Sequence, residues 1–137
     1  MMVSTKGRYA LRIMIDLAQN RDAGYISLSD VSRRQFVSLK YMEAIVSILN
    51  KAGFVESLRG KDGGYRLTRA PEAYTIGSIL KLTEGSLAPI SCAEFGSNTV
   101  CAQAGSCVTL PMWQHLDEIV DSYLERITLL DLINGNV

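Results

Sequence analysis

The sequence predicts a mainly α-helical fold that carries one small β-hairpin and ends in a long helix. Apolar residues recur at helical spacing in several stretches of the 137-residue chain, including residues 38–52 and 111–127. A single pair of β-like runs, residues 54–59 and 65–69, is joined by a glycine-rich turn. With 47% hydrophobic residues the chain can bury one good core, so we expect one domain with an appended arm.

The first helix is expected over residues 4–20, with Ser4 or Thr5 as its N-cap. Its apolar residues share one face, namely Ala10, Ile13, Met14, Leu17 and Ala18. A second, short helix begins at Ser27-Leu28-Ser29-Asp30, which resembles a capping box, and ends near residue 35. Both helices are therefore marked by their caps as well as by their apolar spacing.

Ser38 is expected to cap a third helix that runs to residue 52, where Gly53 supplies a left-handed stop. Its inward face consists of Met42, Ile45, Val46 and Leu49. The β-like runs that follow are joined by Gly60-Lys61-Asp62-Gly63-Gly64, and Asp-Gly between such runs is a strong hairpin signal. Helix, turn, helix and hairpin in this order predict a winged helix-turn-helix.

A fourth helix, capped by Thr75 and running to about residue 83, completes the expected DNA-binding domain, residues 1–85. Residues 86–109 show no period and carry the cysteines. Residues 110–137 contain the long helix, from Pro111 to about residue 127, and a short helix over 128–133. The long helix has a broad apolar stripe that we expect to pack against a second copy in a homodimer, namely Trp113, Leu116, Val120, Tyr123, Leu124 and Ile127.

The charges are divided unequally between the two halves of the chain. Residues 1–69 hold twelve basic and six acidic residues, whereas residues 70–137 hold two basic and eight acidic ones. Such an asymmetry indicates a nucleic-acid or anionic-surface partner, although a solvated charged face is the simpler alternative. No apolar run is long enough to span a bilayer and no signal peptide is evident, so we expect a cytoplasmic protein without membrane contact.

In a winged helix-turn-helix the second helix of the motif enters the major groove of double-stranded DNA. The outward residues near its start are the candidates for groove contact, namely Ser38, Lys40, Tyr41, Glu43 and Ala44. Arg59 and Lys61 in the wing suit the minor groove or its flanking phosphates. Ser4, Lys6 and Arg8 at the first helix are expected to bind phosphate. For each of these residues, simple exposure to solvent is the alternative.

The three cysteines follow the spacing Cys92-x8-Cys101-x5-Cys107, in a loop ahead of a helix. An odd, clustered set in a reducing compartment indicates ligands or redox thiols rather than disulfides. An iron–sulfur cluster, a thiol switch, a zinc ion and inert cysteines are the alternatives, and the cluster is favoured. Clusters and zinc ordinarily take four ligands, so one is missing. The candidates are Glu94, Asn98, Gln103, Ser106, His115, and an exogenous thiol or water.

Four segments resemble the bacterial winged-helix regulators that include IscR, NsrR and CymR: residues 4–11 (STKGRYAL), 38–43 (SLKYME), 59–67 (RGKDGGYRL) and 127–129 (ITL). The resemblance covers essentially the whole chain. It implies homodimers on palindromic or near-palindromic operators, with the long helix as dimer interface. It also implies an iron–sulfur cluster on the three cysteines, of the 2Fe–2S rather than the 4Fe–4S type.

The fourth ligands of this family do not carry over to this chain. IscR-like members have a histidine three residues beyond the third cysteine, where this chain has Leu110. NsrR-like members use an N-terminal aspartate of the partner subunit, where this chain has Arg8. An incomplete ligand set indicates a labile or reactive cluster, which would suit a sensor.

The expected function is transcription regulation, as a repressor controlled by the cluster, and not catalysis. The cluster would sense iron, cluster, redox or nitric oxide status. The alternative within this class is a regulator of cysteine or sulfur metabolism controlled by thiol redox or by a partner protein, without a cluster. A thiol oxidoreductase or zinc enzyme is disfavoured, because the chain has no Cys-x-x-Cys pair and one histidine. A winged helix that binds only another protein is the remaining rival.

Overall fold

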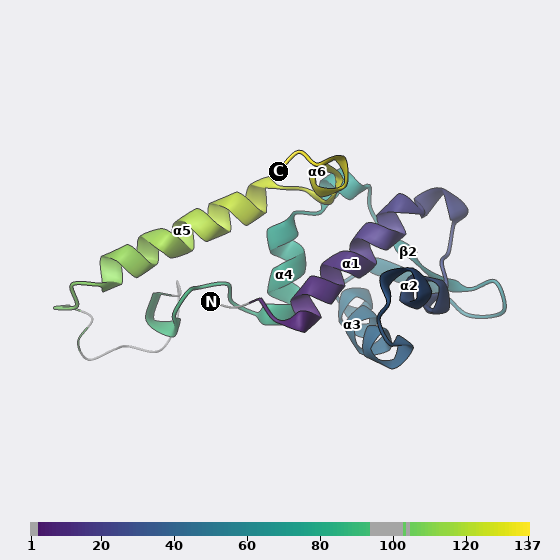
Figure 1. Ribbon diagram of the computed structural model, residues 1–137, viewed down its shortest axis with the longest axis horizontal. Coiled ribbons are helices and arrows are strands. Elements are labelled where there is room, and N and C mark those ends of the chain that lie inside the picture. Colours follow the sequence, from purple (N-terminus) through teal and green to yellow (C-terminus); the bar gives the residue numbers. More distant parts are fainter. Residues whose placement is uncertain (1–2, 94–102, 104) are drawn as a thin grey trace.

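The helix-turn-helix and its hairpin form one body, and a long helix leads away from it (Figure 1). The computed structural model describes residues 3–93, 103 and 105–137. The first three helices of the body are α1 (Thr5–Gln19), α2 (Leu28–Gln35) and α3 (Leu39–Lys51). A short 3-10 turn, η1 (Arg21–Ala23), follows α1. The mainly helical fold with a hairpin wing that the sequence predicts is confirmed.

The helices begin at the residues that the sequence marks as caps. Ser4, Ser27 and Ser38 each accept a hydrogen bond from the backbone N–H three residues on, at 3.3, 3.2 and 3.3 Å. Thr75 does the same for α4 (Ile76–Glu84), at 3.0 Å. Each bond satisfies one of the N–H groups that the first turn of a helix leaves without a partner, which is why these starts are readable from sequence.

The wing is an antiparallel pair of strands, β1 (Val55–Leu58) and β2 (Gly64–Leu67), with Val55 opposite Leu67. A third segment joins it, because the backbone N–H and C=O of Ile26 bond those of Tyr65 at 2.9 and 2.8 Å. This crossing needs Gly64, since a Cβ atom there would collide with the carbonyl oxygen of Ile26. The bridge ties the wing to the chain that leads into α2.

Tyr74 anchors the base of the wing to the helical core. Its ring is fully buried, and its hydroxyl donates to the Phe54 carbonyl at 2.7 Å. The same hydroxyl accepts from the backbone N–H of Thr68 and of Arg69, at 3.1 and 3.0 Å. Between the wing and Tyr74 lies the 3-10 turn η2 (Pro71–Ala73). One tyrosine therefore pairs three backbone groups at the point where the hairpin leaves the core.

The C-terminal part returns to the same core. After η3 (Ser91–Ala93) and the cysteine segment, α5 (Leu110–Arg126) leads back to α6 (Leu129–Asn134), which packs against α1. Thr128 and Asp131 form a complete capping box at the start of α6. None of the described helices is long and apolar enough to cross a membrane.

A short backbone seam fastens the end of α5 to the start of α4. The N–H of Ile76 donates to the Ile127 carbonyl at 2.9 Å, and the N–H of Leu129 donates to the Tyr74 carbonyl at 2.9 Å. Ile127 is 6% exposed and belongs to the core of its own chain. This corrects the sequence prediction that Ile127 faces a second subunit, because the chain leaves helical geometry at Ile127 and turns inward.

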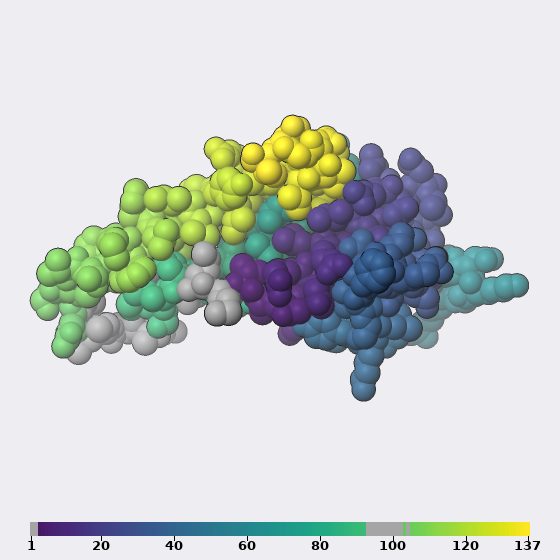
Figure 2. Space-filling model, viewed as in Figure 1, coloured from purple at the N-terminus to yellow at the C-terminus, as the bar shows by residue number. Residues whose placement is uncertain are grey.

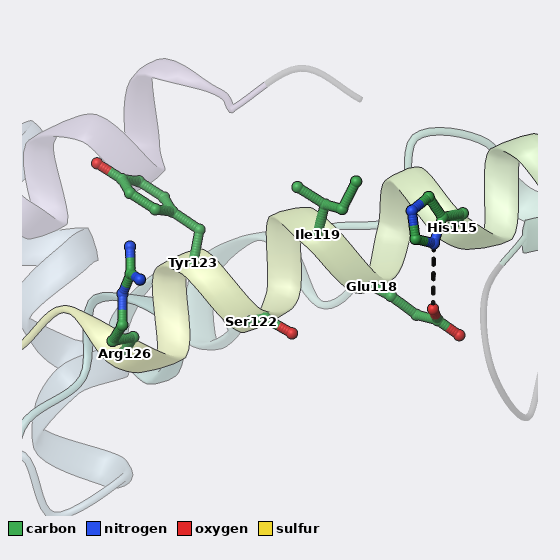
Figure 3. A pocket seen from close by; sticks show the side chains of 6 residues that line it. All are labelled: His115, Glu118, Ile119, Ser122, Tyr123 and Arg126. Atoms are coloured by element: carbon green, nitrogen blue, oxygen red, sulfur yellow. Dashed lines mark ion pairs between the residues drawn. The ribbon is translucent and has the colours of Figure 1, made fainter.

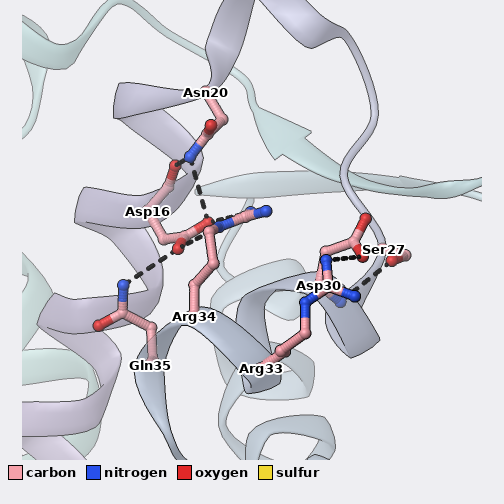
Figure 4. A network of polar contacts seen from close by, with 7 residues as sticks. All are labelled: Asp16, Asn20, Ser27, Asp30, Arg33, Arg34 and Gln35. Carbon is pink, nitrogen blue, oxygen red and sulfur yellow. Dashed lines mark hydrogen bonds and ion pairs between the residues drawn. The ribbon is translucent and has the colours of Figure 1, made fainter.

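Asp16 is the single charged residue in the buried set of the described chain, with 1% of its surface exposed. Figure 4 shows Arg34, Gln35 and Asn20 converging on it. The Arg34 guanidinium donates to both carboxylate oxygens, at 2.9 and 2.6 Å, and the Gln35 amide donates at 3.0 Å. The hydrogen bond to Asp16 also raises the pKa of Arg34. The Asp16 carboxylate therefore joins α1 to α2.

We expect Arg34→Ala to lower the free energy of unfolding by about 3 kcal/mol, because it leaves the Asp16 carboxylate buried without its cation. The neighbouring Arg33→Ala is the matched control. Among the described residues Arg33 pairs only with Asp30, at the surface, so its loss should cost less than about 0.5 kcal/mol. Urea unfolding at one fixed protein concentration measures both. Equal losses in the two variants would contradict a structural role for the Asp16 network.

Candidate nucleic-acid interface and cysteine site

The outer face of α3 is exposed to solvent. Its inward residues are those that the sequence predicts, namely Met42, Ile45, Val46 and Leu49, all buried. Lys40, Glu43, Ala44 and Ser47 are exposed. The start of α3 therefore presents a continuous polar face to an external partner.

Four of the five predicted groove residues line one shallow hollow, namely Ser38, Lys40, Tyr41 and Ala44. The fifth, Glu43, is exposed on the same helix but does not line it. Tyr41 is held in place by Tyr9 of α1, whose ring meets it edge to face at 5.5 Å between centroids. The guanidinium carbon of Arg12 in turn lies 5.3 Å from the centroid of the Tyr9 ring. Tyr41, the aromatic residue that lines the hollow, is therefore held by contacts within its own chain.

The wing carries two unpaired cations. Arg59 and Lys61 are exposed, and within the described part of the chain neither they nor Lys40 form an ion pair. Arg66 differs, because it pairs with Glu56 across the strands and lies 4.4 Å from the Tyr25 ring centroid. The charges at the tip of the wing are those available to an anion.

The start of α1 is already bound by a carboxylate, which sequence reasoning missed. The backbone N–H of Ser4 donates to Glu84 Oε1 at 3.0 Å, and the Ser4 hydroxyl donates to the same oxygen. Gly7 permits this approach, since a Cβ atom there would collide with the Glu84 carboxylate. Lys6 is half-buried and Arg8 is exposed, with a bond to Thr5 at 3.3 Å. Ser4 therefore uses its polar groups within the chain, and Lys6 and Arg8 are the groups left for a phosphate.

Two of the three predicted cysteine ligands lie in the described residues, and Cys101 lies outside them, as do Glu94 and Asn98. Cys92 is exposed in η3, which packs against α5. Cys107 lies two residues before Thr109, the N-cap of α5, with its Sγ 3.3 Å from the Thr109 hydroxyl. Within the described residues no three acidic, cysteine or histidine side chains converge on a metal position.

Hydrogen bonds favour the ionised form of Cys107. The Thr109 hydroxyl and the backbone N–H groups of Thr109 and Leu110 lower the pKa of the Cys107 thiol. Thiolate is the form that binds metals and the form that reacts with oxidants. The donor set therefore fits an iron–sulfur cluster, and it fits a redox thiol equally well. Of the other candidate ligands, Gln103 accepts the Ser106 N–H with its backbone carbonyl, at 3.0 Å, and His115 Nδ1 lies 3.6 Å from Glu118 Oε2.

The apolar residues of α5 form two adjoining rows. Trp113, Val120 and Leu124 are half-buried, and the last two line an apolar hollow together with Val3, Leu80, Ile119 and Tyr123. A second row is exposed at the spacing i, i+4, i+7, i+11, namely Met112, Leu116, Ile119 and Tyr123. The predicted set included Leu116 and Tyr123 but missed Met112 and Ile119, although their spacing could have revealed them.

Figure 3 shows Ile119 and Tyr123 projecting from the same side of α5, while Glu118 and Ser122 point away from it. Arg126 lies over the Tyr123 ring, 5.6 Å from its centroid. None of the 17 residues of α5 is fully buried in the single chain, and four of its apolar residues are exposed, namely Met112, Leu116, Ile119 and Tyr123. An unpartnered face of this kind marks an interaction surface.

Polar contacts fix the direction of α5 against α4. Lys81 reaches from α4 to both Asp121 and Glu125, the latter at 3.0 Å. The Thr75 hydroxyl donates to the other oxygen of Glu125 at 2.8 Å. The hydrogen bond to Asp121, followed by that to Glu125, raises the pKa of Lys81. These contacts add to the backbone seam, so the orientation of α5 is set by the helix-turn-helix body.

Comparison with known proteins gives consistent results. A sequence model described as "Rrf2: Iron-dependent Transcriptional regulator" matches residues 3–135. The transcriptional regulator IscR of Escherichia coli is 36% identical over 135 residues, covering 98% of this chain and 82% of that protein.

Two solved structures are similar over nearly the whole fold. CymR of Bacillus subtilis, described as the global cysteine regulator of that organism, has a TM-score of 0.82 and 34% identity, covering 98% of both chains. IscR of T. potens has a TM-score of 0.79 and 34% identity, covering all of this chain and 89% of that one.

Proposed function

The chain belongs to the Rrf2 family of DNA-binding transcriptional regulators, and we propose that it is a homodimeric repressor controlled by an iron–sulfur cluster. The carrying observation is the exposed face of α3, with its hollow at Ser38, Lys40, Tyr41 and Ala44, in a body whose wing also exposes Arg59 and Lys61. Base contacts in the major groove would come from α3. Phosphate contacts would come from Arg59 and Lys61, with Lys6 and Arg8 at the start of α1.

The dimer would form through α5. The wing and α5 lie at opposite ends of the molecule (Figure 2), so pairing through α5 leaves the face of α3 and the wing of each copy open. Two copies related by a twofold axis would then read two half-sites of a palindromic operator. The exposed row Met112, Leu116, Ile119 and Tyr123 supports this arrangement, because it provides the apolar core that such an interface needs.

Cys92, Cys101 and Cys107 would hold the cluster, of the 2Fe–2S type, and a fourth ligand would come from elsewhere. The lowered pKa of Cys107 and the packing of η3 against α5 support this assignment. Such a cluster supplies a redox-active and oxidant-sensitive centre. Cys92 lies in η3, which packs against α5, and Cys107 lies two residues before the N-cap of α5. A change in this segment would therefore bias the placement of the two copies of α3 in the dimer.

A second candidate is a thiol-controlled regulator of sulfur metabolism that has no cluster. It is favoured by one observation, the exposed Cys92 together with the thiolate-prone Cys107. The similarity to the B. subtilis cysteine regulator CymR supports it at the level of the whole fold. The two candidates differ in whether iron is present.

We expect Lys61→Ala to weaken binding to every duplex alike and to reduce the slope of log affinity against log salt by about one unit. Fluorescence anisotropy on a duplex selected from a random pool, and on the unselected pool, measures this at several salt concentrations. Lys61→Arg, which retains the charge, is the control and should keep the slope. An unchanged slope in Lys61→Ala would remove Lys61 from the phosphate contacts.

Ile119→Glu is expected to raise the dimer dissociation constant at least about tenfold, because a carboxylate would have to be buried in the apolar interface. Sedimentation velocity over a range of concentrations gives the constant. The conservative Ile119→Leu should remain dimeric. A wild-type protein that is monomeric at all concentrations would refute the dimer, and an unaffected Ile119→Glu dimer would place the interface elsewhere.

Protein purified without oxygen is expected to show visible charge-transfer bands, with about two irons and two sulfides per chain. Cys92→Ser should lose the bands and the iron, whereas Val108→Ala, at an exposed neighbour of Cys107, should keep both. Absorption spectroscopy with iron and sulfide analysis decides this. A colourless, iron-free wild type after anaerobic reconstitution would favour the thiol-controlled candidate.

A further inference from the structure

Phe36 combines two unfavourable features at one position. It has a φ of 55°, the one positive value at a non-glycine residue in the part of the chain that the structure describes. Its side chain is 92% exposed. Left-handed backbone at a helix end usually carries glycine or asparagine, and it is a genuine outlier for a bulky residue. A phenylalanine here strains the backbone and gains almost no packing from its own chain.

The ring is held outward by a rigid turn. On one side, the Gln35 carbonyl accepts a hydrogen bond from Arg12. On the other, the N–H of Val37 donates to the Ser32 carbonyl at 3.3 Å, and the Ser32 hydroxyl donates to the Val37 carbonyl. Val37 itself is 7% exposed and packs in the core. The backbone on both sides of Phe36 is therefore anchored. The folded structure itself holds the ring in its exposed position.

The position of Phe36 identifies the kind of partner. It caps the end of α2 and lies two residues before Ser38, the cap of α3. The hollow at Ser38, Lys40, Tyr41 and Ala44 begins directly after it. Arg33 and Lys40, one on each side of it in sequence, are both exposed. A fully exposed apolar ring on a chain segment with exposed cations before and after it in sequence suits a polyanion that also offers apolar surface, as the edge of a DNA groove does.

We propose that Phe36 contacts DNA directly, with its ring against apolar atoms at the edge of the major groove that α3 enters. Those atoms are the thymine methyl group and the face of the deoxyribose. The contact would compensate for the strain of the turn, which is how strained residues at binding sites are retained. This inference rests on the proposed function, since it requires α3 to enter the groove. It assigns the turn before α3, as well as α3 itself, to the DNA interface.

The test separates a binding role from a structural one. Phe36→Gly and Phe36→Asn both suit left-handed backbone, so each should melt at or above the temperature of the wild type. On a duplex that the wild type has selected from a random pool, both should bind about tenfold more weakly. The slope of log affinity against log salt should stay unchanged, because the ring carries no charge. Val137→Asn, at another exposed apolar residue, is the control and should bind normally.

A duplex with uracil in place of thymine identifies the atoms touched, because uracil lacks the methyl group. If the ring meets a thymine methyl, the wild type weakens on uracil DNA and Phe36→Gly loses nothing further. If the ring meets deoxyribose, the wild type is unaffected by uracil and Phe36→Gly is weak on both duplexes. Either pattern supports the contact.

The proposal is overturned if both Phe36 variants bind within about twofold of the wild type. That result would indicate that the exposed Phe36 ring contacts a protein partner and not DNA. It is also overturned if both variants melt well below the wild type, since Phe36 would then be structural. A wild type that binds no duplex at all would refute the proposed function as a whole, and so is distinguishable from a failure at Phe36 alone.

Discussion

The backbone seam between residues 74–76 and 127–129 is the constraint on which the arrangement of the molecule depends. Two hydrogen bonds of 2.9 Å join the start of α4 to the segment after α5. They bring Ile127 and Leu129 into the core and so set the direction in which α5 leaves the body. Without this seam, a helix with no fully buried residue would have little to orient it. The proposed dimer and the proposed placement of the two copies of α3 both follow from that direction.

α4 is the element that the other parts share. Its first residue carries the seam, its Lys81 bonds Asp121 and Glu125 of α5, and its last residue, Glu84, bonds the cap of α1. The cysteine segment begins directly after α4. A displacement of α4 would therefore also move the start of α1, where Lys6 and Arg8 lie, and α5. This gives the proposed sensor segment a packed connection to the proposed DNA-binding face.

The local features of the fold were predictable because each depends on neighbours in sequence. Each helix start follows from a Ser or Thr cap, whose side chain accepts a hydrogen bond from the backbone N–H three residues later. The hairpin follows from its Asp-Gly turn. The inward face of α3 follows from helical spacing and is confirmed. The same spacing exposes Lys40, Glu43 and Ala44, so most of the candidate groove residues follow from the order of residues along one helix. The family resemblance rests on these same segments and is confirmed by the comparisons.

The sequence by itself determined the element order, the caps, the wing and the division of charge, because these are set by residue type and short-range spacing. Only the tertiary structure decided which partner each exposed or buried group would meet. It buried Asp16 against Arg34, occupied Ser4 with Glu84 eighty residues away, and turned Ile127 into the core. It also left Phe36 exposed at the end of α2. Such pairings join segments distant along the chain, and spacing within one helix or strand carries no information about them.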